Sequence, residues 1–97
     1  MGAQEFEHTG YGDTAEAAFA SAIEEAGYEH GHGGYSGTIV EKQSFRMIDC
    51  AEDLDMINAT MEDCMQDAGH WVQDKWGDAG CIKVREGTYL FFGWASS

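Results

Sequence analysis

The segment best suited to chemistry is the glycine-rich stretch 28–37, which reads YEHGHGGYSG. His30 and His32 form an H-x-H pair, and on an extended backbone both side chains would point to the same side, as metal ligation requires. A third ligand would have to come from Glu29, His8 or His70. Because H-x-H alone specifies no ligand set, we predict no cofactor and name His30 and His32 as the residues that a metal would use.

A loop of this composition more often forms a turn with a recognition surface than a metal centre. Its aromatic and imidazole side chains are candidates for partner binding: Tyr28, His30, His32 and Tyr35. A small-ligand or metal-binding protein built on this loop is therefore the alternative function.

Other catalytic patterns fail on inspection. A G-x-G-x-x-G phosphate loop starting at Gly31 would need glycine where Ser36 stands, and no G-K-[ST] follows. Cys64 lies on an apolar helical stripe and Cys81 begins a predicted strand, and neither belongs to a nucleophile motif. We predict that the protein is not an enzyme, and a small enzyme is the third alternative.

The charge balance restricts the partners. Five basic residues face 18 acidic ones, a formal net charge of −13. Such a surface repels nucleic-acid phosphates and anionic membranes and attracts basic protein surfaces. We therefore expect no direct nucleic-acid or membrane binding, and we expect a protein partner with a basic surface.

Length and cysteine content set the context. The 97 residues correspond to one domain, 1–97. Cys50, Cys64 and Cys81 are odd in number and lack C-x-x-C spacing, so they predict neither a disulfide framework nor a zinc site. Reduced cysteines indicate a cytoplasmic protein.

Hydrophobic periodicity predicts the elements of the first half. Residues 4–8 alternate around Phe6 and indicate a strand, and Asp13 with Glu16 forms a capping box that opens a helix. The helix stripe is rich in alanine, so this helix can lie close to a sheet, and Gly27 is its expected C′ residue. Residues 38–48 then predict a second strand.

The second half predicts a longer helix and a hairpin. The apolar stripe over 49–76 indicates a helix that Gly69 kinks or splits. Strands 81–85 and 88–95 surround Gly87, with Arg85 opposite Thr88 and Val84 opposite Tyr89. The last strand is apolar on both faces, which favours a central position. The prediction is an α+β fold, β-α-β-α-β-β, with a four-stranded mixed sheet and two helices packed on one face.

This arrangement would give the helices an outward acidic surface and leave a mildly basic, aromatic open sheet face. The second helix carries Glu62, Asp63 and Asp67 on its outer side, and these are our partner-binding candidates. Acidic helix faces can also be merely solvated. An inhibitor or a mimic of nucleic acid is a special case of the binding hypothesis. Independently of the acidic surface, an exposed tryptophan would mark a protein contact or a homodimer seam.

Three segments have a distinctive composition: HGHGGYSGTI over 30–39, KWGDAGCI over 75–82 and FFGWAS over 91–96. Together they resemble small orphan proteins of bacteriophages that infect actinobacteria. The resemblance covers about a quarter of the chain and brings no known activity or site residue with it. It implies a viral protein that works inside a bacterial host. Together with the charge balance, we predict a non-catalytic regulator that binds a host protein with a basic surface.

Overall fold

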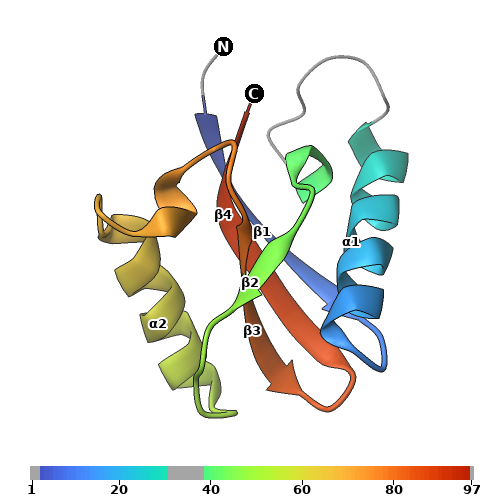
Figure 1. Ribbon diagram of the computed structural model, residues 1–97. Coiled ribbons are helices and arrows are strands. Elements are labelled where there is room, and N and C mark those ends of the chain that lie inside the picture. The colour runs from blue at the N-terminus through green and yellow to red at the C-terminus, as the bar shows by residue number, and fades with distance from the viewer. Residues whose placement is uncertain (1–2, 31–38, 97) are drawn as a thin grey trace.

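The computed structural model describes residues 3–30 and 39–96. Its elements follow the order β1 (Ala3–Tyr11), α1 (Ala15–His30), η1 (Ile39–Glu41), β2 (Phe45–Met47), α2 (Leu54–Gln66), η2 (Trp71–Gln73), β3 (Ala79–Arg85) and β4 (Thr88–Ser96). The predicted α+β class and the β-α-β-α-β-β order are confirmed (Figure 1). Two short 3₁₀ helices, η1 and η2, replace parts of the predicted strand and helix.

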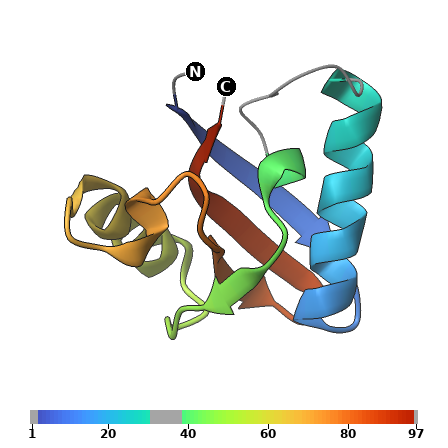
Figure 2. The same cartoon turned by 45° about the horizontal axis from the view of Figure 1, so that its top comes forward.

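The sheet has the order β1-β4-β3-β2. β1 and β3 are antiparallel to β4, and β2 is parallel to β3, so the sheet is mixed as predicted. β4 lies between β1 and β3, which confirms the central position expected for a strand that is apolar on both faces. The start of β1 lies beside the end of β4, since Ala3 pairs with Ser96 (Figure 2).

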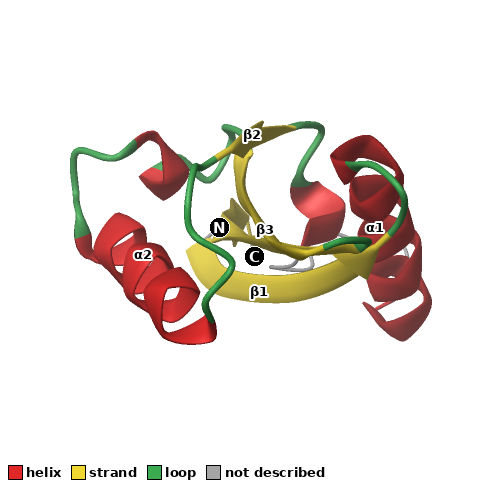
Figure 3. Cartoon of the chain, turned by 90° about the horizontal axis from the view of Figure 1, so that it is seen from below, coloured by secondary structure: helices red, strands yellow, loops and turns green. Residues whose placement is uncertain are grey.

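The two helices do not pack on one face, and this prediction is wrong. α1 places Ala18, Phe19, Ala22 and Ala26 in one core with Cys81 and Phe91. α2 places Ile57 and Cys64 in a second core with Ile82, Leu90 and Phe92. Successive strand residues point to opposite faces, so Phe91 and Phe92 mark the two sides of the sheet. Figure 3 shows the sheet between α1 and α2.

The strand order explains this arrangement. β1 and β2 are the two edge strands, so the connection through α1 runs from one edge of the sheet to the other. The connection through α2 runs back from β2 to its neighbour β3, in the opposite direction. Crossovers between parallel strands share one hand, so two crossovers that run in opposite directions lie on opposite faces. No open sheet face remains over the central strands, and the mildly basic aromatic face we expected is absent from the described residues.

α1 begins differently from the prediction. The side chain of Thr14, not Asp13, caps the helix: its Oγ1 accepts from the Ala17 N–H at 3.2 Å. The helix continues through Gly27, which is buried, to His30. Its close approach to β1 is confirmed, because a Cβ added to Gly10 would lie 2.4 Å from the Ala18 carbonyl oxygen.

The predicted helix 49–76 is split, as its glycine suggested. α2 starts after the N-cap Asp53, whose carboxylate accepts from the Asp55 N–H at 2.9 Å, and it ends at Gln66. Gln73 in η2 then donates from Nε2 to the carbonyl oxygens of Cys64 (3.1 Å) and Met65 (2.6 Å). These bonds satisfy carbonyls that the end of α2 leaves without an intrahelical partner.

The described part of the predicted strand 38–48, residues 39–48, is mostly not a strand. Only Phe45–Met47 form β2, and Lys42 follows η1 in a buried position. Its Nζ donates to the carbonyl oxygens of Asp74 (3.2 Å), Lys75 (3.3 Å) and Gly77 (3.0 Å). Burial lowers the pKa of Lys42, while Asp74 and Asp78 act in the opposite direction. Lys42 therefore belongs to the interior rather than to a basic surface.

The hairpin forms around Gly87, which has a φ of 80°. Arg85 pairs with Thr88 as predicted, but Tyr89 pairs with Lys83 instead of Val84. The register shift between Lys83 and Arg85 is a bulge at Val84. It explains why Ile82 shares a core with Leu90 and Phe92, not with Tyr89 as the unbulged register required.

Candidate functional site

The exposed face of α2 carries the carboxylates of Glu62 and Asp63. Ile57 and Cys64 turn towards the sheet, so Glu62 and Asp63 lie on the solvent side and are exposed. Among the described residues, neither carboxylate forms a salt bridge with a basic side chain. Their negative charge is therefore available to an external partner.

The third predicted residue has a local role as well. Asp67 is the C-cap of α2, and its backbone N–H donates to the Asp63 carbonyl oxygen at 3.1 Å. Its carboxylate Oδ1 accepts from the Gly69 N–H at 2.9 Å. Asp67 is exposed and lies one turn from Asp63, but its carboxylate also holds the turn that ends the helix.

A groove of about 240 Å³ separates α2 from the edge strand β1. Met61 and Met65 of α2 and Phe92 of β4 give it apolar walls, and Glu5, Phe6 and Glu7 of β1 complete the lining. Glu5 is opposite Trp94 and Glu7 is opposite Phe92, so both glutamate side chains lie on the α2 face of the sheet. The acidic surface of α2 thus continues across the groove onto β1.

This lining suits a lysine or arginine side chain. Thioether and aromatic groups can cover the aliphatic part of such a side chain, and methionine adapts to irregular shapes. Glu5 and Glu7 are exposed and supply the opposite charge at the border of the groove. The chemistry of the site is therefore recognition of cationic side chains.

Glu5 and Glu7 were not among the predicted site residues, because the acidic surface expected from the sequence lay on the helices. The signal was present in the alternation Glu5-Phe6-Glu7. A buried Phe6 turns one face of the strand inward and places both glutamates on the other. Their proximity to Met61 and Met65 depends on the tertiary structure.

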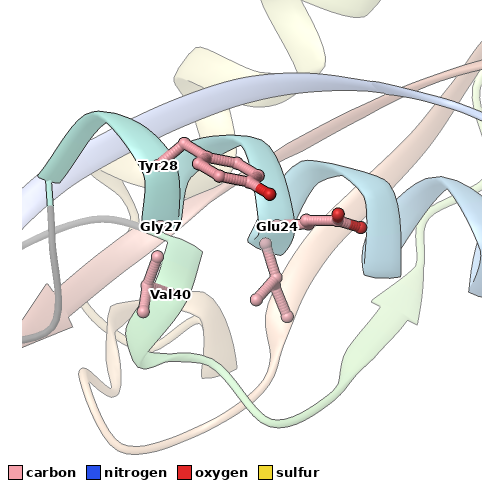
Figure 4. A pocket seen from close by; sticks show the side chains of 5 residues that line it. Glu24, Gly27, Tyr28 and Val40 are labelled. Atoms are coloured by element: carbon pink, nitrogen blue, oxygen red, sulfur yellow. The ribbon is translucent and has the colours of Figure 1, made fainter.

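The described part of the segment 28–37, residues 28–30, is helical. Tyr28, Glu29 and His30 belong to the last turn of α1, so the extended H-x-H geometry does not hold at His30. Tyr28 is 85% exposed and borders a cavity of about 460 Å³ with Ile23, Glu24, Gly27 and Val40 (Figure 4). His32 and Tyr35 lie outside the described residues.

The other suggested metal ligands have different partners. His8 Nε2 lies 3.2 Å from a carboxylate oxygen of Glu25, and His70 Nδ1 accepts from the Val72 N–H at 3.0 Å. Over 3–30 and 39–96, no three histidine, cysteine or acidic side chains form a group that could hold a metal ion. The structure brings neither His8 nor His70 into a ligand cluster.

Two of the three thiols are poorly suited to nucleophilic chemistry. Burial raises the pKa of Cys81 to about 12. Burial also raises the pKa of Cys64, and the nearby Asp63 and Asp67 add to this effect. Both groups are protonated thiols at neutral pH, and only a thiolate is a strong nucleophile.

Comparison of the chain with protein-family models, curated proteins and solved structures finds no match.

Proposed function

We propose that this chain is a non-catalytic binding protein that attaches to a host protein with a basic surface. The observation that carries the proposal is the groove between β1 and α2, with Met61, Met65 and Phe92 inside and Glu5 and Glu7 at its border. The exposed Glu62 and Asp63, which form no salt bridge with a described basic residue, extend the same negative surface. A net charge of −13 would accelerate the encounter with a basic partner.

The proposal includes a phage origin and action in the host cytoplasm, where the protein would inhibit or redirect its partner. The raised pKa values of Cys64 and Cys81 support a non-catalytic role. Within the described residues, no helix is long and apolar enough to cross a bilayer.

The test is capture of partners from an actinobacterial lysate at low and high salt, about 0.05 M and about 0.5 M, because screening weakens exposed charge pairs. We compare the wild-type chain with the variant Glu62→Gln, Asp63→Asn, Asp67→Asn. A control variant, Asp13→Asn, Glu24→Gln, Asp49→Asn, removes the same charge from exposed positions elsewhere.

We expect one partner that binds at low salt, dissociates at high salt and is lost by the α2 variant alone. Equal loss in both variants would mean that bulk charge, not this surface, attracts the protein. Equal binding by the wild type and the α2 variant would also contradict the proposal.

Small-ligand binding is the second candidate function, and the cavity beside Tyr28 favours it. Ile23, Val40 and the Tyr28 ring would cover an apolar molecule there (Figure 4). A neutral solvatochromic dye such as Nile red provides the test. Saturable binding of the dye that Tyr28→Ala abolishes would support the cavity as a ligand site, and binding unchanged by this substitution would exclude it.

A further inference from the structure

The outer edge of β1 lies next to the acidic groove and has no neighbouring strand among the described residues. β1 is nine residues long, and in the part of the chain that the structure describes it pairs only with β4. Edge strands of this length present rows of N–H and C=O groups that can accept another strand. Proteins commonly bind extended peptides by adding them to such an edge.

The register identifies which backbone groups face outward. The Gly12 N–H donates to the Gly87 carbonyl oxygen at 3.1 Å, and the β1–β4 register continues from this pair without a shift. Hydrogen-bonded and non-hydrogen-bonded pairs alternate along an antiparallel ladder. Even-numbered residues of β1 therefore bond to β4, and the N–H and C=O groups of Glu5, Glu7 and Thr9 point away from the sheet.

The same residues carry the charges. A strand added to β1 would place every second side chain beside Glu5 and Glu7, on the face that holds the groove. Lysine or arginine at these alternate positions would pair with the two carboxylates and lay its aliphatic part against Met61 and Met65. The backbone edge and the side-chain chemistry thus both favour an extended peptide with lysine or arginine at alternate positions.

A second copy of the chain fits poorly where its β1 would lie across Glu5 and Glu7. In an antiparallel β1–β1 pair centred on Glu5, Phe6 or Glu7, at least one glutamate would lie directly opposite another glutamate. Like charges opposite each other destabilise a strand pair, and each copy carries a net charge of −13.

We propose that β1 binds an extended peptide segment of its partner by β-strand addition, with basic side chains at every second position. This inference rests on the proposed function and adds the binding mode and the partner's chemistry. Its test varies Glu5, Glu7 and the peptide backbone, whereas the test of the proposed function varies Glu62, Asp63 and Asp67 of α2.

The test uses synthetic peptides of defined pattern. The first has lysine at alternate positions with valine and threonine between them. The second has the same composition with the lysines adjacent. The third repeats the first sequence but carries N-methyl groups on the amides that would bond to β1. Isothermal calorimetry at low salt compares their affinities.

We expect the alternating peptide to bind, and the other two peptides to bind about tenfold more weakly. The clustered peptide loses the alternate charge pairs, and the N-methylated peptide loses the backbone hydrogen bonds to β1. Glu5→Gln with Glu7→Gln should weaken the alternating peptide about fivefold, in line with two cross-strand charge pairs. The matched variant Asp13→Asn with Glu16→Gln, on exposed positions at the start of α1, should bind like the wild type.

Amide hydrogen exchange reports the binding mode directly. The alternating peptide should slow exchange at Glu5, Glu7 and Thr9 and leave the N–H groups already bonded to β4 nearly unchanged. Equal affinity for all three peptides, or binding without new protection at these amides, would overturn strand addition.

The two proposals can fail separately. Peptides that do not bind, together with a lysate partner that the α2 variant loses, would remove the strand-addition mode and keep the proposed function. A different outcome is a dimer in sedimentation that dissociates when Thr9→Pro removes an outward N–H of β1. This result would identify a second copy of the chain as the occupant of the edge and would overturn the inference.

Discussion

Lys42 and Gly77, 35 positions apart in the chain, are joined by a hydrogen bond of 3.0 Å from Nζ to the backbone carbonyl oxygen. The same ammonium donates to the carbonyls of Asp74 and Lys75, so its three protons are all used. This cation ties the segment after η1 to the turn that precedes β3.

Lys42→Met should destabilise the protein by roughly 3 kcal/mol, since it leaves three carbonyls without this donor and an unpaired buried group costs about 1–3 kcal/mol. Urea unfolding measures the change. Arg85→Met is the control, because Arg85 is exposed and should change stability by no more than about 0.5 kcal/mol. Similar values for both variants would show that Lys42 has no such role.

Gly10→Ala should destabilise the protein by about 1–3 kcal/mol through overpacking. The new Cβ would lie 2.4 Å from the Ala18 carbonyl oxygen and 3.0 Å from the Phe91 ring, so α1 must move away from β1. Gly69→Ala makes the same change where, among the described residues, the new Cβ would meet only the Asp67 carboxylate, at 3.5 Å. Thermal unfolding should separate the two variants clearly, and equal melting temperatures would refute the close packing of α1.

Asp78 should make part of the stability depend on pH. A hydrogen bond from Ser44, followed by the hydrogen bond and charge of Arg46, holds the pKa of Asp78 below its ordinary value of 3.8. A lowered folded-state pKa means that the stabilisation is present above pH 3.8 and is lost as pH falls through the folded-state pKa.

The variant Asp78→Asn tests this dependence. The difference in unfolding free energy between wild type and Asp78→Asn should be largest near neutral pH and should narrow below about pH 4. Ser44→Ala removes the largest cause of the lowered Asp78 pKa. In this background, the effect of Asp78→Asn on the unfolding free energy near neutral pH should be smaller. A difference that stays constant from about pH 7 to about pH 3 would contradict the assignment.

The three thiols should react at different rates. Cys50 is half-buried, whereas Cys64 and Cys81 are buried with raised pKa values. Ellman's reagent should therefore modify one thiol quickly in the native protein and all three after denaturation, without added reductant. Cys50→Ser should remove the fast phase. A single reactive thiol in the denatured chain would indicate a disulfide instead.

Much of the fold could be predicted from local patterns. Three local features act over a few residues: the alanine stripe of α1, Gly69 just after α2, and the turn at Gly87. The sequence alone therefore identified these elements. The two apolar faces of β4 even indicated its central place in the sheet. Net charge and its concentration on α2 were equally visible, because they need no knowledge of distant neighbours.

The tertiary structure decided which of these elements meet. The strand order β1-β4-β3-β2 makes the two crossovers run in opposite directions, and this places α1 and α2 on opposite faces. It also brings Glu5 and Glu7 to the same groove as Met61 and Met65, more than 50 positions away. No periodicity within one element encodes such a contact, since it depends on pairing between distant segments whose order the local pattern leaves open.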